Sequence, residues 1–120
     1  MRRAGRIGWI VTIVYWCGLF LLTHLPARRL PVVPVTDKTA HFVCYGILAT
    51  ALFISLRFSS ARQATDVALI VLAVMLAYGA IDEWTQIPVG RSCEMADWYA
   101  DAAGAATAVT LAGIISRWVR

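Results

Sequence analysis

Charge is what this sequence has least of. Only 15% of its 120 residues are Asp, Glu, Lys or Arg, whereas 60% are hydrophobic. A typical soluble domain is about 25% charged. The hydrophobic core of a soluble domain of 120 residues is also too small to enclose continuous apolar runs. The scarcity of charge therefore excludes an ordinary water-soluble domain and predicts a chain that uses the lipid bilayer as its solvent.

Other absences exclude further classes of protein. The three cysteines, Cys17, Cys44 and Cys93, have no CxxC spacing, which excludes a disulfide framework and a zinc knuckle. The net charge is +4, but the basic residues form no stripe with interleaved aromatics, which excludes nucleic-acid binding. The sequence has no Gly-rich phosphate loop and no Ser or Thr placed beside a His as an acyl nucleophile.

Apolar residues form four long runs, at about residues 7–23, 40–56, 67–81 and 100–119. Each run approaches the roughly 17–25 residues that a spanning helix needs, and polar turns can extend its ends. The first run lacks an A-x-A cleavage pattern, so it is expected to be a retained span and not a signal peptide. The sequence predicts an all-α membrane protein with one domain, residues 1–120, containing four transmembrane helices at about 7–24, 37–56, 66–87 and 97–119.

The distribution of basic residues predicts the orientation of these helices. The segments on the side of the N-terminus carry seven basic residues and the opposite segments carry four: Arg2, Arg3, Arg6, Arg57, Arg62, Arg117 and Arg120 against Arg28, Arg29, Lys38 and Arg91. Positive residues concentrate on the cytoplasmic side of membrane proteins. Both termini are therefore expected in the cytoplasm.

Acidic residues are concentrated in two short stretches beside apolar runs. Six of the seven acids lie there, namely Asp37, Asp82, Glu83, Glu94, Asp97 and Asp101. Intramembrane carboxylates are rare, because a charge at the bilayer centre costs roughly 2.5–3.5 kcal/mol even on lenient scales, and they usually face a protein interior. With cytoplasmic termini, both stretches would lie at the outer face, so the sequence predicts a polar site there.

Helical periodicity predicts that these polar residues converge. At about 100° per residue, each of three helices gathers its polar side chains on one arc: Asp37, Lys38, His41 and Tyr45; Tyr78, Asp82, Glu83 and Gln86; Asp97 and Asp101. Arg91, in the loop before the last helix, would close the shared pocket. The pair Gly104 and Ala108 would allow close backbone approach below the polar layer.

The residue types suggest roles but leave alternatives open. His41, Glu83 and Asp82 are candidate catalytic acids or bases, with Asp37 one turn from His41 as the group that orients its imidazole. The candidate substrate-binding residues are Asp37, Lys38, Tyr45, Tyr78, Gln86, Arg91, Asp97 and Asp101. A divalent cation (Mg²⁺, Mn²⁺, Ca²⁺ or Zn²⁺) could be bound by His41, Asp82, Glu83, Asp97 and Asp101. In the alternative, Lys38 and Arg91 offset the acids in an ion-pair network that only fixes helix packing.

The order of these motifs resembles the VanZ-like family of small bacterial membrane proteins. The resemblance rests on His24-x-Pro26, Asp37-Lys38-x-x-His41-Phe42-x-x-Tyr45, Asp82-Glu83-x-x-Gln86, Gly90-Arg91 and Asp97-x-x-x-Asp101-x-x-Gly104. Asp101 departs from the pattern, because the family usually has Asn there. The resemblance implies a multi-pass protein of the bacterial cytoplasmic membrane. It also implies a link to low-level resistance to the glycopeptide teicoplanin, the property for which the family is named.

Two classes of function follow. In the first, the protein binds or modifies a polar envelope molecule at the outer leaflet, such as a lipid-linked saccharide, a phospholipid headgroup or a glycopeptide. In the second, it is a non-catalytic structural or assembly subunit. The bilayer is the partner common to both, and the sequence leaves open whether the chain is an enzyme.

Overall fold

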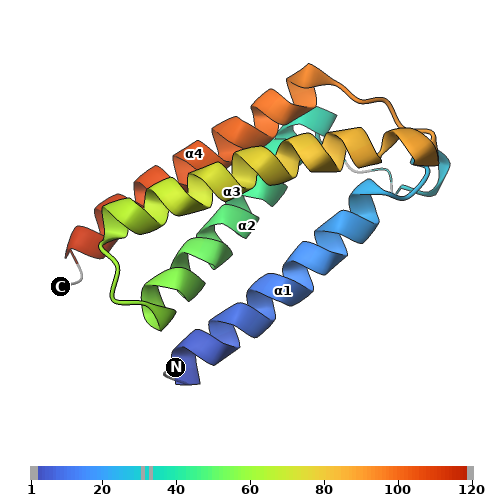
Figure 1. The fold of residues 1–120 in the computed structure, drawn as a ribbon. Helices are drawn as coiled ribbons and strands as arrows, with labels where there is room; N and C mark the ends of the chain where they lie inside the picture. Colours follow the sequence, from blue (N-terminus) through green and yellow to red (C-terminus); the bar gives the residue numbers. More distant parts are fainter. Residues whose placement is uncertain (1–2, 31, 33, 119–120) are drawn as a thin grey trace.

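The computed structural model describes residues 3–30, 32 and 34–118. Four long helices, α1 (Arg3–Thr23), α2 (Asp37–Ser59), α3 (Ala64–Thr85) and α4 (Met95–Trp118), are joined by short connections that include the 3-10 turns η1 (Ala27–Arg29) and η2 (Ile87–Val89) (Figure 1). The described part of the chain contains no strand. All four helices are long and apolar enough to cross a membrane. The predicted all-α bundle of four transmembrane helices is confirmed.

Local sequence explains where the helices begin and end. The hydroxyl of Thr36 caps α2 by accepting a hydrogen bond from the backbone N–H of Thr39, and Asp37 in the first turn complements the helix dipole. Helix α1 begins at Arg3 instead of near residue 7, because Arg and Ala are good helix formers and the cost of Gly5, about 1 kcal/mol relative to Ala, does not end the helix. The predicted end of the last helix at Val119 lies outside the described residues, as do Arg2 and Arg120.

The four helices run in alternating directions. Both termini and the α2–α3 connection lie at one end of the bundle, and the α1–α2 and α3–α4 connections lie at the other (Figure 1). Helix α2 packs against each of the other three helices. The molecule measures 46 × 26 × 25 Å, and its longest dimension is close to the roughly 40–45 Å thickness of a bilayer with its headgroups.

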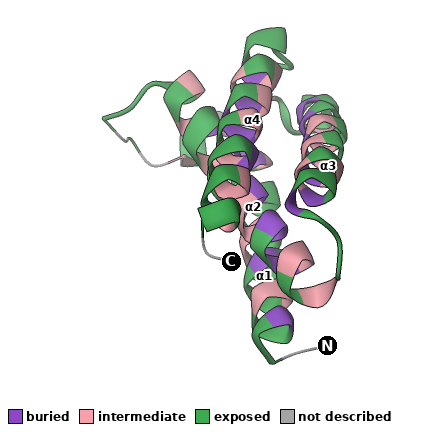
Figure 2. Cartoon of the chain, turned by 90° about the vertical axis from the view of Figure 1, so that its left-hand side faces the viewer, coloured by how far each residue is buried: buried purple, intermediate pink, exposed green. Residues whose placement is uncertain are grey.

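Burial follows the pattern of a membrane bundle. Leu48, Val67 and Val71 are fully buried between the helices, whereas the outward surface of every helix is largely exposed (Figure 2). Many of the exposed side chains are large and apolar, among them Ile7, Val14, Leu69, Leu111 and Ile115. An apolar surface of this extent would promote association in water, but it is compatible with lipid chains.

Helices α2 and α4 approach each other closely at Gly104. A Cβ atom at this position would overlap the backbone carbonyl of Phe42, and a Cβ at Gly46 on α2 would lie 3.4 Å from the carbonyl oxygen of Gly104. The small residues Gly46 and Gly104 allow this contact. In lipid, helices associate through close packing of this kind, because the hydrophobic effect does not drive them together. The contact lies beside the polar end of the bundle, so it also sets the distance between the polar residues of α2 and α4.

We predict that Gly104→Ala lowers the melting temperature of the detergent-solubilised protein, because the added methyl must push α4 away from α2. Overpacking of this kind costs about 1–3 kcal/mol. Gly113→Ala on the same helix is the matched control, since a Cβ there meets nothing within 4 Å, and it should leave the melting temperature unchanged or slightly higher. Equal melting temperatures for the two variants would contradict the close approach.

Candidate functional site

Polar side chains from all four helices meet at the end of the bundle that carries the α1–α2 and α3–α4 connections. The buried members are Thr23 of α1, His41 and Tyr45 of α2, Asp82 and Glu83 of α3, Gln86 at its C-cap, and Asp97 and Asp101 of α4. Five of these side chains are at most 2% exposed: Tyr45, Asp82, Glu83, Gln86 and Asp101. The three arcs drawn from the sequence thus face one another.

Asp82 is the most completely hydrogen-bonded acid of this group. Its Oδ1 accepts hydrogen bonds from the hydroxyls of Thr23 (3.0 Å) and Tyr78 (3.3 Å). Its Oδ2 accepts from the hydroxyl of Tyr45 (2.7 Å) and from Nε2 of Gln86 (3.2 Å). The four donors come from α1, α2, α3 and the C-cap of α3, so this carboxylate joins three helices at one point.

His41 is oriented by an acid of another helix. Its Nδ1 lies 2.7 Å from Oδ1 of Asp101, whereas Asp37, the expected partner on its own helix, lies 3.9 Å from Nε2. Because an ionised carboxylate only accepts hydrogen bonds, this short contact assigns the proton to Nδ1. Nε2, which lies 3.8 Å from Oδ2 of Asp97, is then free to accept a proton.

Asp101 and Glu83 are less completely satisfied than Asp82. Oδ2 of Asp101 is buried and has no hydrogen-bond partner among the described residues. A Cβ atom placed on Gly79 would lie 3.4 Å from this oxygen, so it points toward α3. Glu83, one turn further along α3, accepts hydrogen bonds from the backbone N–H of Glu94 (3.1 Å) and from Nε2 of Gln86 (3.5 Å).

Lys38 binds the acids nearest the outer rim of this site. It forms ion pairs with Asp97 and, at 2.8 Å, with Glu94, and its Nζ lies 3.7 Å from Oδ2 of Asp37. Glu94 lies in the α3–α4 connection, where hydrogen bonds from Lys38 and then Ser92 hold the pKa of its carboxyl below the usual range. Lys38 therefore connects the start of α2 to the start of α4.

Arg91 takes a different position from the one expected in the ion-pair alternative. Its Nη1 donates to the backbone carbonyl of Leu25 at 3.5 Å, and in the part of the chain that the structure describes it forms no ion pair with an acid. Because the guanidinium forms no such ion pair, it could bind an anion beside the α1–α2 connection. Of Lys38 and Arg91, the two cations expected in that network, only Lys38 is paired with carboxylates of the described residues.

Sequence reasoning missed the contribution of α1 to this site. Besides the bond from Thr23, the ring of His24 lies 3.8 Å from Oδ1 of Asp82 and hydrogen-bonds through Nε2 to the hydroxyl of Thr85 (2.9 Å). The available signal was the placement of two adjacent polar residues, Thr23 and His24, at the end of an otherwise apolar run.

A cavity of about 700 Å³ adjoins the buried acids. One part of its wall is apolar and is formed by Leu19, Leu22, Leu30, Val32, Val35 and Val43. The polar part includes Asp37, His41 and Arg91, together with Thr23 and Tyr45. The same side chains that hold Asp82 and Asp101 from one side thus face this cavity from the other.

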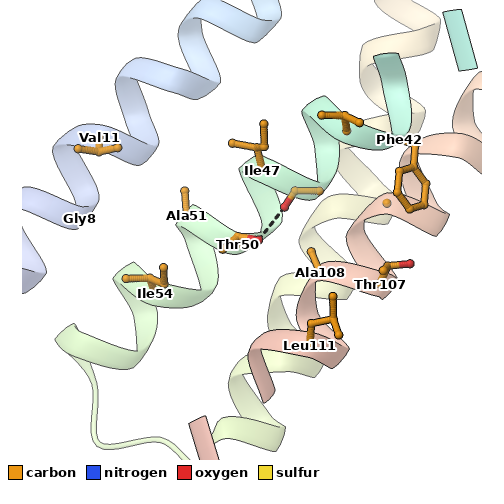
Figure 3. A pocket seen from close by; sticks show the side chains of 13 residues that line it. Gly8, Val11, Phe42, Ile47, Thr50, Ala51, Ile54, Thr107, Ala108 and Leu111 are labelled. Atoms are coloured by element: carbon orange, nitrogen blue, oxygen red, sulfur yellow. Dashed lines mark hydrogen bonds between the residues drawn. The ribbon is translucent and has the colours of Figure 1, made fainter. Parts of the chain in front are cut away.

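A second cavity, of about 560 Å³, lies between α1, α2 and α4 (Figure 3). Val11, Ile47, Ile54 and Leu111 extend into it. Its lining contains no ionisable side chain, and the hydroxyl of Thr50 is bonded to the backbone carbonyl of Gly46 on its own helix (2.9 Å). This groove offers packing surface but no acid or base chemistry.

Among known proteins, the model of the VanZ/LLP1 family matches residues 7–116 of this chain, which is nearly its whole length. No curated protein and no solved structure matches it.

Proposed function

Because the chain belongs to the VanZ/LLP1 family and is a multi-pass membrane protein, we propose that it binds or modifies an amphiphilic component of the cell envelope. The observation that carries this proposal is the cavity of about 700 Å³, which combines an apolar wall with a polar end. Ligand sites are typically concave and mostly apolar, with a few polar groups that fix orientation.

The distribution of residues around the cavity supports an amphiphile over a wholly polar ligand. An acyl or prenyl chain would contact Leu22, Val32 and Val35 on the apolar side. A polar headgroup would lie between Arg91, whose guanidinium forms no ion pair with a described acid and could bind an anion, and His41, whose Nε2 can accept a proton. If the protein is an enzyme, His41 oriented by Asp101 would be its base, and Glu83 would be the second candidate.

We place this cavity at the outer face of the bacterial cytoplasmic membrane. The seven-to-four distribution of basic residues supports cytoplasmic termini, and the cavity lies at the opposite end of the bundle. A lipid-linked saccharide, a phospholipid or a glycopeptide would then reach it from the outer leaflet. Altered teicoplanin susceptibility belongs to this proposal as its cellular consequence.

A structural or assembly role is the second candidate, and one observation favours it. Asp82 accepts four hydrogen bonds and joins three helices, which is what a packing device requires. His41 and Asp101 do not fit this role equally well, because Nε2 of His41 and Oδ2 of Asp101 have no hydrogen-bond partner among the described residues.

We predict that purified wild-type protein retains an envelope amphiphile that is detected by native mass spectrometry. The variant His41→Ala should lose the amphiphile because it removes the imidazole from the polar end of the cavity. The variant Val35→Trp should lose it because the indole ring would fill the cavity, and Val35 is exposed, so the larger side chain should not disturb the helix packing. Thr107→Ala, which lies in the other groove, is the control and should retain it. Equal retention by all four proteins, or none in the wild type, would refute the proposed site.

Cys93 provides a test of orientation. This residue is exposed in the α3–α4 connection, whereas Cys17 and Cys44 lie within α1 and α2, where lipid and protein shield them from an aqueous reagent. We predict that a membrane-impermeant thiol reagent labels this protein in intact cells, or in spheroplasts if the cells have an outer membrane. The variant Cys93→Ser should not be labelled. Labelling that requires a broken membrane would place the cavity on the cytoplasmic side.

A further inference from the structure

The acids of the site fall into two groups that differ in how their charge is balanced. The outer acids, Asp97 and Glu94, are paired with Lys38. The inner acids are Asp82, Glu83 and Asp101, and no Lys or Arg within residues 3–30, 32 and 34–118 forms an ion pair with any of them. Among the basic side chains that the structure describes, only the imidazoles of His24 and His41 approach these inner acids.

Hydrogen bonds reach both oxygens of Asp82 and of Glu83, but only one oxygen of Asp101. Asp82 accepts four hydrogen bonds. Oδ2 of Asp101 accepts none among the described residues, although this side chain is only 1% exposed. A buried carboxylate oxygen without a donor is strongly disfavoured, so this oxygen requires a proton, a water molecule or a cation as its partner.

The carboxylate of Asp101, which carries this oxygen, lies where other ligand atoms converge. It points toward the wall of α3 at Gly79, one turn before Glu83. One donor atom from each of His41, Glu83 and Asp101 lies within 4.8 Å of the others, and all three side chains are buried. Ligands bound at about 2.0–2.6 Å to one ion are separated by at most twice that distance, so the three atoms can share an ion after small side-chain rotations.

We propose that His41, Glu83 and Asp101 bind a divalent transition-metal ion between α2, α3 and α4. His41 would bind the ion through Nδ1, the nitrogen nearest Asp101, and the ion would take the place of the Nδ1 proton and of its hydrogen bond to Asp101. One imidazole nitrogen and two carboxylate oxygens suit Mn²⁺ or Zn²⁺ better than Ca²⁺, which prefers oxygen ligands alone. The ion supplies the positive charge that the inner acids lack. Asp82, with its four donors, lies beside the ion as a neighbour and not as a ligand.

This inference deepens the proposed function, because His41 also faces the cavity and the ion would lie at the polar end of a bound amphiphile. A metal ion there would attract an anionic headgroup. The two claims are measured separately, by retained metal and by retained amphiphile. Retention of metal without amphiphile would refute the proposed function alone, and retention of amphiphile without metal would refute the cation site alone.

The test uses Mn²⁺ as the probe. The full-length protein in detergent is stripped with EDTA and dialysed against Mn²⁺, and we expect about one tightly bound Mn²⁺ per chain together with a higher melting temperature, because binding to the folded state stabilises it. Electron spin echo spectroscopy of bound Mn²⁺ should show a directly coordinated ¹⁴N nucleus. His41→Gln should lose this nitrogen signal, and Glu83→Gln and Asp101→Asn should each bind Mn²⁺ at least tenfold more weakly.

Two control variants make the result decisive. Asp66→Asn neutralises an exposed acid at the other end of α3 and should bind Mn²⁺ as the wild type does. Asp37→Asn tests the other group of possible ligands around His41, namely Asp37, His41 and Asp97, and should also leave binding intact. The proposal is overturned if the wild type binds no Mn²⁺, if the nitrogen signal is absent, or if Asp37→Asn removes the ion while Glu83→Gln and Asp101→Asn keep it.

Discussion

Placing several carboxylates within membrane-spanning helices is the constraint on which the rest of this structure depends. An uncompensated charge in the bilayer is unfavourable by several kcal/mol, so each acid at the polar end needs donors, a cation or a proton. The chain uses a different solution for each one. Asp82 receives four hydrogen bonds, Asp97 receives Lys38, and Asp101 receives His41 on one oxygen only.

Close packing between the helices makes these pairings possible. Gly104 lets α4 approach the backbone of α2, which brings Asp101, one turn before Gly104, to within 2.7 Å of His41. Helix α2 contacts every other helix, so its His41 and Tyr45 reach acids of both α4 and α3. Close packing in the apolar layer and polar contact above it are therefore two results of one geometry.

Hydropathy and helical periodicity were sufficient to predict the four-helix fold and the side of each helix that carries its polar residues, because both depend on local sequence. The partner of His41 was not predictable in this way. Asp37 is four residues away on the same helix, and only tertiary packing makes Asp101 on α4 the closer partner. The cavity was also missed, because the irregular segment that includes Leu30, Val32 and Val35 forms much of its apolar wall and has no periodicity from which its position could be inferred.

We infer that Asp101 is kept for a ligand at the expense of stability, and the melting temperature of Asp101→Asn in EDTA tests this inference most directly. Asn keeps an oxygen acceptor for His41 and removes the charge that faces α3. We predict that this variant melts at or above the wild-type temperature, since neutralisation relieves an unbalanced buried charge. If the acid instead stabilises helix packing, removal of its charge should cost roughly 3–5 kcal/mol, and a melting temperature well below that of the wild type would contradict the account.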